Sequence, residues 1–129
     1  MTQQRTLQVT SLLSVLLFTF HWADEISRGI EAGTINASGG FAILFVWLYA
    51  TLAIADRRVG LVLILVGSIL ASGVPILHMT GAGLVGKRIL PNTEGAFFWV
   101  WTNIALGATG MITFALTVRA LWTFHRGQA

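Results

Sequence analysis

Four long stretches of this chain carry no charged side chain, and together they take up most of its length. They contain no Asp, Glu, Lys or Arg and cover Thr6–Ala23, Gly39–Ala55, Val59–Met79 and Gly95–Val118. A helix needs about 20 apolar residues to cross the ~30 Å hydrocarbon layer of a bilayer. Because lipid offers no hydrogen-bond partners to the backbone, such segments must satisfy their own backbone groups as helices. The stretches therefore predict an all-α integral membrane protein with four transmembrane helices.

The composition and the short connections favour a single membrane domain. Hydrophobic residues make up 55% of the chain and charged residues 10%, whereas an average soluble domain has about 25% charged residues. We expect one transmembrane domain over residues 1–129, with helices at about 6–28, 38–56, 58–79 and 93–124. Short links between antiparallel neighbours predict an up-down-up-down bundle. No link is long enough to hold a soluble catalytic domain.

The basic residues predict an orientation in the membrane. One end of the predicted bundle receives Arg5, Arg57, Arg58, Arg119 and Arg126, and the other receives Arg28, Lys87 and Arg88. Cytoplasmic ends of membrane helices carry the excess of Lys and Arg. We therefore expect both termini in the cytoplasm and the protein in the inner or plasma membrane.

Several function classes are excluded by composition and motif. The net charge is only +3 and basic residues never cluster beyond two, which argues against a nucleic-acid partner. The segment from Gly81 to Lys87 has the G-x-x-x-x-G-K spacing of a nucleotide loop, but Arg88 stands where Ser or Thr must hold Mg²⁺. The chain has no cysteine, so disulfides, thiolate ligands and iron–sulfur clusters are also excluded.

The main candidate for chemistry is a polar stripe along the first helix. Residues three and four apart share a face of a helix, and this stripe comprises Thr10, Ser14, His21, Asp24, Glu25 and Arg28. In a membrane, a stripe of this kind faces the bundle interior or a wet cavity and not the lipid. Asp24 and Arg28 have the spacing of a helix salt bridge.

Two further polar residues are expected at the same membrane face. His78 ends the third helix and Glu94 begins the fourth, so the topology places both on the side where His21 lies. The predicted ligand-binding or proton-binding residues are therefore His21, Asp24, Glu25, His78 and Glu94. Histidine nitrogens and carboxylate oxygens bind divalent metals, and the predicted metal ligands are His21, Glu25, His78 and Glu94. The residues expected to support them are Arg28, Ser14 and Trp101.

Small and unusual residues indicate how the helices pack. Close contacts are expected at Gly67, Ser68, Ala71 and Ser72 of the third helix and at Ala105 and Thr109 of the fourth. Trp47 is expected to fill the core. Asn103 is expected to hydrogen-bond another helix.

The pattern favours a binding or transport protein over an enzyme, and no catalytic residue is assigned. We expect a pocket in the outer leaflet that binds a divalent cation or a proton, for transport or sensing, within the lipid bilayer. One alternative is an accessory subunit that packs in a larger membrane complex or a homo-oligomer. Others are a membrane enzyme acting on a lipid with His21 and Glu25 as acid and base, and a haem between His21 and His78. A purely structural role for these polar groups, near a membrane boundary, is also open.

Overall fold

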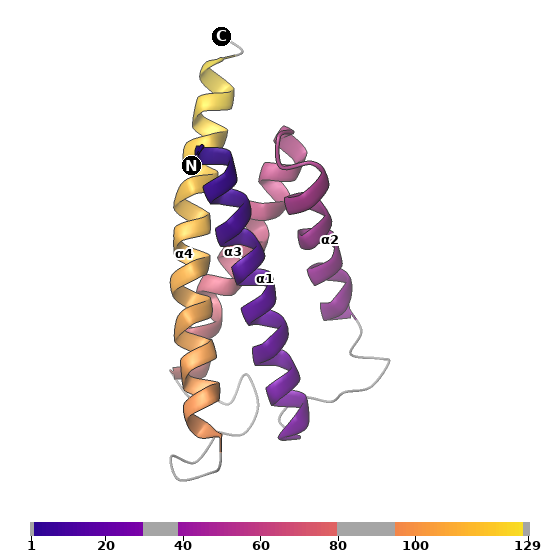
Figure 1. The fold of residues 1–129 in the computed structure, drawn as a ribbon, viewed down its shortest axis with the longest axis vertical. Helices are drawn as coiled ribbons and strands as arrows, with labels where there is room; N and C mark the ends of the chain where they lie inside the picture. Colours follow the sequence, from indigo (N-terminus) through magenta and orange to yellow (C-terminus); the bar gives the residue numbers. More distant parts are fainter. Residues whose placement is uncertain (1, 30–38, 80–94, 128–129) are drawn as a thin grey trace.

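The computed structural model describes residues 2–29, 39–79 and 95–127, and these form four α-helices. The helices are α1 (Gln3–Ser27), α2 (Gly39–Ala53), α3 (Arg58–Met79) and α4 (Ala96–Arg126), as Figure 1 shows. The prediction of an all-helical chain with four helices is confirmed. The N- and C-terminal ends of the chain lie toward the same end of the bundle (Figure 1).

Three of the helices are long and apolar enough to cross a membrane, namely α1, residues Arg58–His78 of α3, and α4. The helix α2 has 15 residues and is therefore about 22 Å long, which is short of a ~30 Å hydrocarbon layer. This helix ends at Ala53 and not at the predicted position 56, because the chain turns between Ile54 and Arg57. The Arg57 N–H donates to the Ile54 carbonyl over 3.0 Å, and a side chain at Gly60 would overlap that same carbonyl.

Two glycines of α4 allow it to approach α3 closely. A Cβ atom added at Gly107 would lie 2.5 Å from Cγ of Pro75, and one added at Gly110 would lie 2.9 Å from Cβ of Ala71. Small residues of α3 therefore form the contact, as the sequence predicts. On α4, the close approach is made at Gly107 and Gly110, which the prediction for Ala105 and Thr109 did not include.

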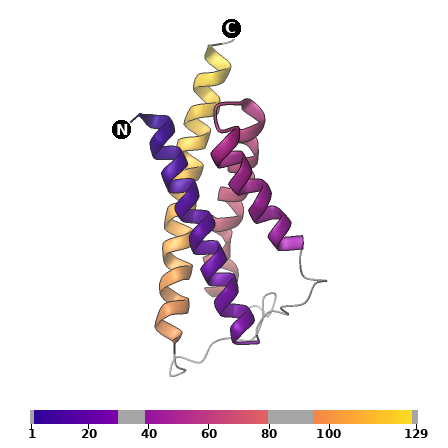
Figure 2. The same cartoon turned by 45° about the vertical axis from the view of Figure 1, so that its right-hand side comes forward.

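The short helix α2 packs against the outside of the bundle and ends partway along it, as Figures 1 and 2 show from two directions. Trp47 of α2 is only 2% exposed, and its ring lies against Gly67, where any side chain would overlap it. Its indole N–H donates to Ser11 Oγ of α1 over 2.9 Å. Trp47 therefore fills the core, as expected. At the end of the bundle where α2 begins, the helices α1, α3 and α4 extend further than α2 does.

Small polar side chains are buried inside this bundle beside an apolar core, and many large apolar side chains are exposed on its outside. The fully buried hydroxyl residues are Ser11, Ser14, Thr51, Ser68, Thr102, Thr113 and Thr117. Large apolar side chains are instead exposed, including Phe97 at 81%, Phe45 at 70% and Ile76 at 64%. Buried hydroxyls that bond across helices are typical of packing within a lipid environment.

Candidate metal centre

Three side chains from two helices converge near the end of the bundle that α2 does not reach. His21 and Glu25 are four residues apart on α1 and therefore share one face, while His78 comes from the last turn of α3. The Nε2 atom of His21 lies 3.4 Å from Oε1 of Glu25, and the Nε2 atom of His78 lies 3.2 Å from the same oxygen. The two Nε2 atoms are 3.3 Å apart. These residues are named the His/Glu triad below.

The triad is shielded from the surface. The side chains of His21, Glu25 and His78 are 3%, 6% and 6% exposed. A carboxylate that is buried to this degree costs several kcal/mol unless a cation or strong hydrogen bonds compensate it. The burial of this carboxylate therefore calls for compensation by hydrogen bonds, by protons or by a metal ion.

Thr102 of α4 lies beside the ring nitrogen of His21 that faces away from the triad. Thr102 Oγ1 lies 2.9 Å from the Phe98 carbonyl oxygen, so its hydrogen is donated to the backbone. The same Oγ1 lies 3.4 Å from His21 Nδ1 and can accept a hydrogen bond from this nitrogen. A neutral imidazole has one N–H, so in the tautomer with hydrogen on Nδ1 the Nε2 atom presents its lone pair to the other two groups. A metal ion bound at Nε2 requires this tautomer.

Trp99 of α4 closes the triad on another side. Its indole N–H donates to Glu25 Oε1 over 3.4 Å. Its ring packs against both imidazoles, with centroids 5.7 Å from the His21 ring and 5.2 Å from the His78 ring. The indole thus supplies one hydrogen bond to the carboxylate and holds both histidine rings in place.

The distances within the triad match those between the ligands of a tetrahedral ion. Ligand atoms about 2.05 Å from a tetrahedral Zn²⁺ lie about 3.3 Å apart, and the three separations here are 3.2, 3.3 and 3.4 Å. Adjacent ligands of an octahedral ion with bonds of about 2.1 Å would lie about 3.0 Å apart. Two histidines and one glutamate also form the ligand set of zinc sites that keep a fourth position open.

The triad does not fit a haem. Two axial histidines bind iron from opposite faces of a porphyrin, so the macrocycle would have to lie between the two Nε2 atoms. The two Nε2 atoms are only 3.3 Å apart, which leaves no room for a macrocycle between them. Trp99 packs against both rings as well. The haem alternative is therefore set aside.

The other predicted site residues have different surroundings. Asp24 pairs with Arg28, whose Nε lies 2.8 Å from Asp24 Oδ2, so this carboxylate takes part in a salt bridge on α1. Ser14 is buried two turns from His21, and its Oγ lies 3.4 Å from Thr113 Oγ1. The structure therefore places Ser14 in the helix packing and away from the triad. Glu94 lies outside the described residues.

Trp101 is not the tryptophan beside the triad. It is 57% exposed, whereas Trp99 contacts all three triad residues. Two residues along a helix correspond to a rotation of about 200°, so the two indoles point in nearly opposite directions. The expectation for Trp101 rested on its sharing a face with Glu94.

Sequence reasoning did not identify Trp99 and Thr102 as site residues. They are three residues apart and share a face of α4, which is the one available signal in the sequence. The neighbouring Asn103 is 3% exposed. Within the described ranges its Oδ1 atom has no hydrogen-bond partner, so the expected bond from this oxygen to another helix is not found there.

The chain matches no protein-family model, and no curated protein or solved structure is significantly similar to it. The triad and the side chains around it are therefore the basis for a functional proposal.

Proposed function

We propose that this chain is an integral membrane protein that binds a divalent transition metal ion of the zinc class at His21, Glu25 and His78. The observation that carries the proposal is the mutual separation of 3.2 to 3.4 Å among three buried donor atoms. Transport or sensing of the cation is the proposed consequence. The fourth position of the ion is left to water or to a further ligand.

The membrane placement is supported by the distribution of side chains. Three helices have the length and composition to span a bilayer, and their outward faces carry large apolar residues. We place the helices in an up-down-up-down arrangement with both termini in the cytoplasm. In this arrangement α2 crosses only part of a ~30 Å layer, unless the bilayer thins around it.

A metal ion at the triad is supported by the contact between His21 and Thr102. With the Nδ1 hydrogen directed to Thr102, the Nε2 atom faces the triad as an acceptor, and the Glu25 oxygen at 3.4 Å from it is an acceptor too. A divalent ion would satisfy both acceptors and also the Nε2 atom of His78. A proton shared within the triad would satisfy the same groups, so the measured metal content decides between the two.

Glu94 is the remaining predicted metal ligand, and it lies outside the described residues. The proposed site therefore uses three protein ligands and leaves the fourth position to an exchangeable ligand such as water. A Glu94→Gln variant with unchanged zinc affinity would support this arrangement. A reduced zinc affinity would instead assign the fourth position to Glu94.

The proposal is tested by the metal content and zinc affinity of the protein purified in mild detergent. The comparison is between the wild type, His21→Ala and His125→Ala, since His125 is exposed in the last turn of α4 and controls for the loss of any histidine. We expect about one zinc per chain in the wild type and in His125→Ala, and none in His21→Ala. A wild type that takes up no divalent ion would refute the proposal and favour the accessory-subunit alternative.

A further inference from the structure

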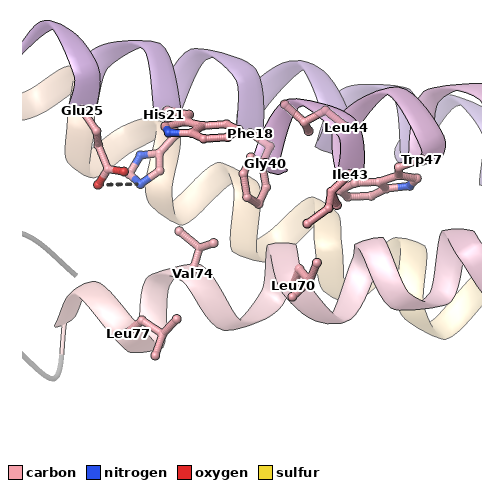
Figure 3. A pocket seen from close by; sticks show the side chains of 11 residues that line it. Phe18, His21, Glu25, Gly40, Ile43, Leu44, Trp47, Leu70, Val74 and Leu77 are labelled. Atoms are coloured by element: carbon pink, nitrogen blue, oxygen red, sulfur yellow. Dashed lines mark ion pairs between the residues drawn. The ribbon is translucent and has the colours of Figure 1, made fainter. Parts of the chain in front are cut away.

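An apolar cavity adjoins the triad between α1, α2 and α3. Its volume is about 340 Å³, which falls in the range of about 300–1,000 Å³ for small-molecule sites. Figure 3 shows His21 and Glu25 at one end of it and Trp47 at the other, with Val74 and Leu70 of α3 along its length. The cavity is partly open, so a ligand can enter it from the side of the bundle.

The polar groups of this cavity lie at one end. His21 and Glu25 are the titratable side chains among its lining residues. The indole N–H of Trp47, at the far end, donates to Ser11 Oγ and is therefore satisfied within the bundle. Because a polar group without a hydrogen-bond partner is unfavourable in an apolar environment, this lining orients a ligand that has a polar end. Its polar end must lie at the triad and its apolar part along Val74 and Leu70.

The charge of a loaded triad selects the polar end. A divalent ion with one carboxylate and two neutral imidazoles has a net charge of about +1, and three ligands leave one tetrahedral position open. A singly negative carboxylate neutralises that charge and provides an oxygen ligand of the kind that zinc accepts. Charge complementarity therefore favours a monocarboxylate over a neutral or dianionic group.

The lining selects the apolar part. Between the triad and Trp47 the cavity is lined by apolar side chains, including Ile43, Leu44, Leu70 and Val74. The part of a ligand that extends away from the triad is therefore a hydrocarbon chain. The surrounding lipid supplies single-chain amphiphiles of this kind directly to the open side.

We propose that the cavity binds one long-chain carboxylate, with the hydrocarbon chain between α1, α2 and α3 and the carboxylate on the fourth position of the metal. This inference rests on the proposed metal site. It makes the fatty acid a ligand of that site, so that metal and fatty acid bind together.

The test uses the full-length protein in nanodiscs loaded with Co²⁺, whose visible spectrum reports a change of ligand. Dodecanoate is titrated against cholate, a rigid carboxylate that also partitions into bilayers. The substitution Leu70→Trp is used to fill the cavity. Leu70 lies about two helical turns from His78 on α3, so the metal ligands themselves are unchanged. The matched control is Ile69→Trp, since Ile69 is the next residue on the same helix, is 52% exposed and does not line the cavity.

We expect dodecanoate to change the Co²⁺ spectrum of the wild type and of Ile69→Trp, while cholate leaves it unchanged. In Leu70→Trp, Co²⁺ binding should be retained and the apparent dodecanoate affinity should fall at least about tenfold, because overfilled sites exclude a chain. Equal responses of Leu70→Trp and the wild type would overturn the fatty-acid site and leave the metal site intact. So would equal responses to cholate and dodecanoate. Absence of a Co²⁺ spectrum before any carboxylate is added would instead overturn the proposed metal function.

Discussion

Replacing Glu25 with glutamine should make the metal-free protein more stable and remove most of its stabilisation by zinc. Glutamine has nearly the same shape as glutamate, and its Oε1 can still accept the Trp99 N–H that lies 3.4 Å away in the wild type. The substitution removes a buried charge from a side chain that is 6% exposed. His21 and His78 can remain neutral afterwards, so no unpaired charge is left behind. The desolvation cost of a buried carboxylate, several kcal/mol, is thereby removed from the folded state.

The loss of zinc stabilisation can be estimated from the number of ligands. Structural zinc sites with four ligands bind with about 10–16 kcal/mol, or about 3 kcal/mol for each ligand. A loss of 3 kcal/mol weakens binding by about 100-fold. At a zinc concentration of about 100 times the wild-type Kd, zinc adds about 2.7 kcal/mol to the wild type but only about 0.4 kcal/mol to Glu25→Gln.

The assay is unfolding in mild detergent, followed by circular dichroism, in the presence of EDTA and of excess zinc. Glu25→Gln should be at least as stable as the wild type in EDTA. Zinc should raise its free energy of unfolding by only about 0.4 kcal/mol, against about 2.7 kcal/mol for the wild type. Loss of the zinc gain without loss of stability in EDTA distinguishes a ligand from a structural residue. A variant that is less stable in EDTA and keeps the full zinc gain would refute the assignment of Glu25 as a ligand.

Two further predictions follow from other contacts. Thr102→Val removes the acceptor 3.4 Å from His21 Nδ1, so zinc affinity measured by calorimetry should fall about 10–100-fold while the helical content is unchanged; an unchanged affinity would show that Thr102 does not set the tautomer. Gly107→Ala places a Cβ atom 2.5 Å from Cγ of Pro75 and should lower the free energy of unfolding by about 1–3 kcal/mol. Gly73→Ala, where a Cβ would meet nothing within 4 Å, should instead be neutral or stabilising by up to about 1 kcal/mol; equal effects of the two variants would contradict this account of α3–α4 packing.

Much of the fold follows from local properties of the chain. Charge-free apolar stretches predict helices, because in lipid the backbone N–H and C=O groups must hydrogen-bond to one another. The structure has four helices at these places. The salt bridge of Asp24 and Arg28, at 2.8 Å, is also local, because a helix brings residues four apart together. The end of α2 at Ala53 is less predictable, since it depends on how tightly the turn near Asp56 closes.

His21 and Glu25 share a helix face by virtue of their spacing alone, so the sequence by itself determined that these two side chains can act together. The topology also placed His78 at the same end of the bundle. Only the tertiary structure decided that His78 reaches Glu25 at 3.2 Å and that Trp99, and not Trp101, packs beside them. These contacts depend on the rotation of α3 and α4 about their axes. The close approaches of Gly107 to Pro75 and of Gly110 to Ala71 contribute to that rotation, and no local pattern specifies such contacts between distant segments.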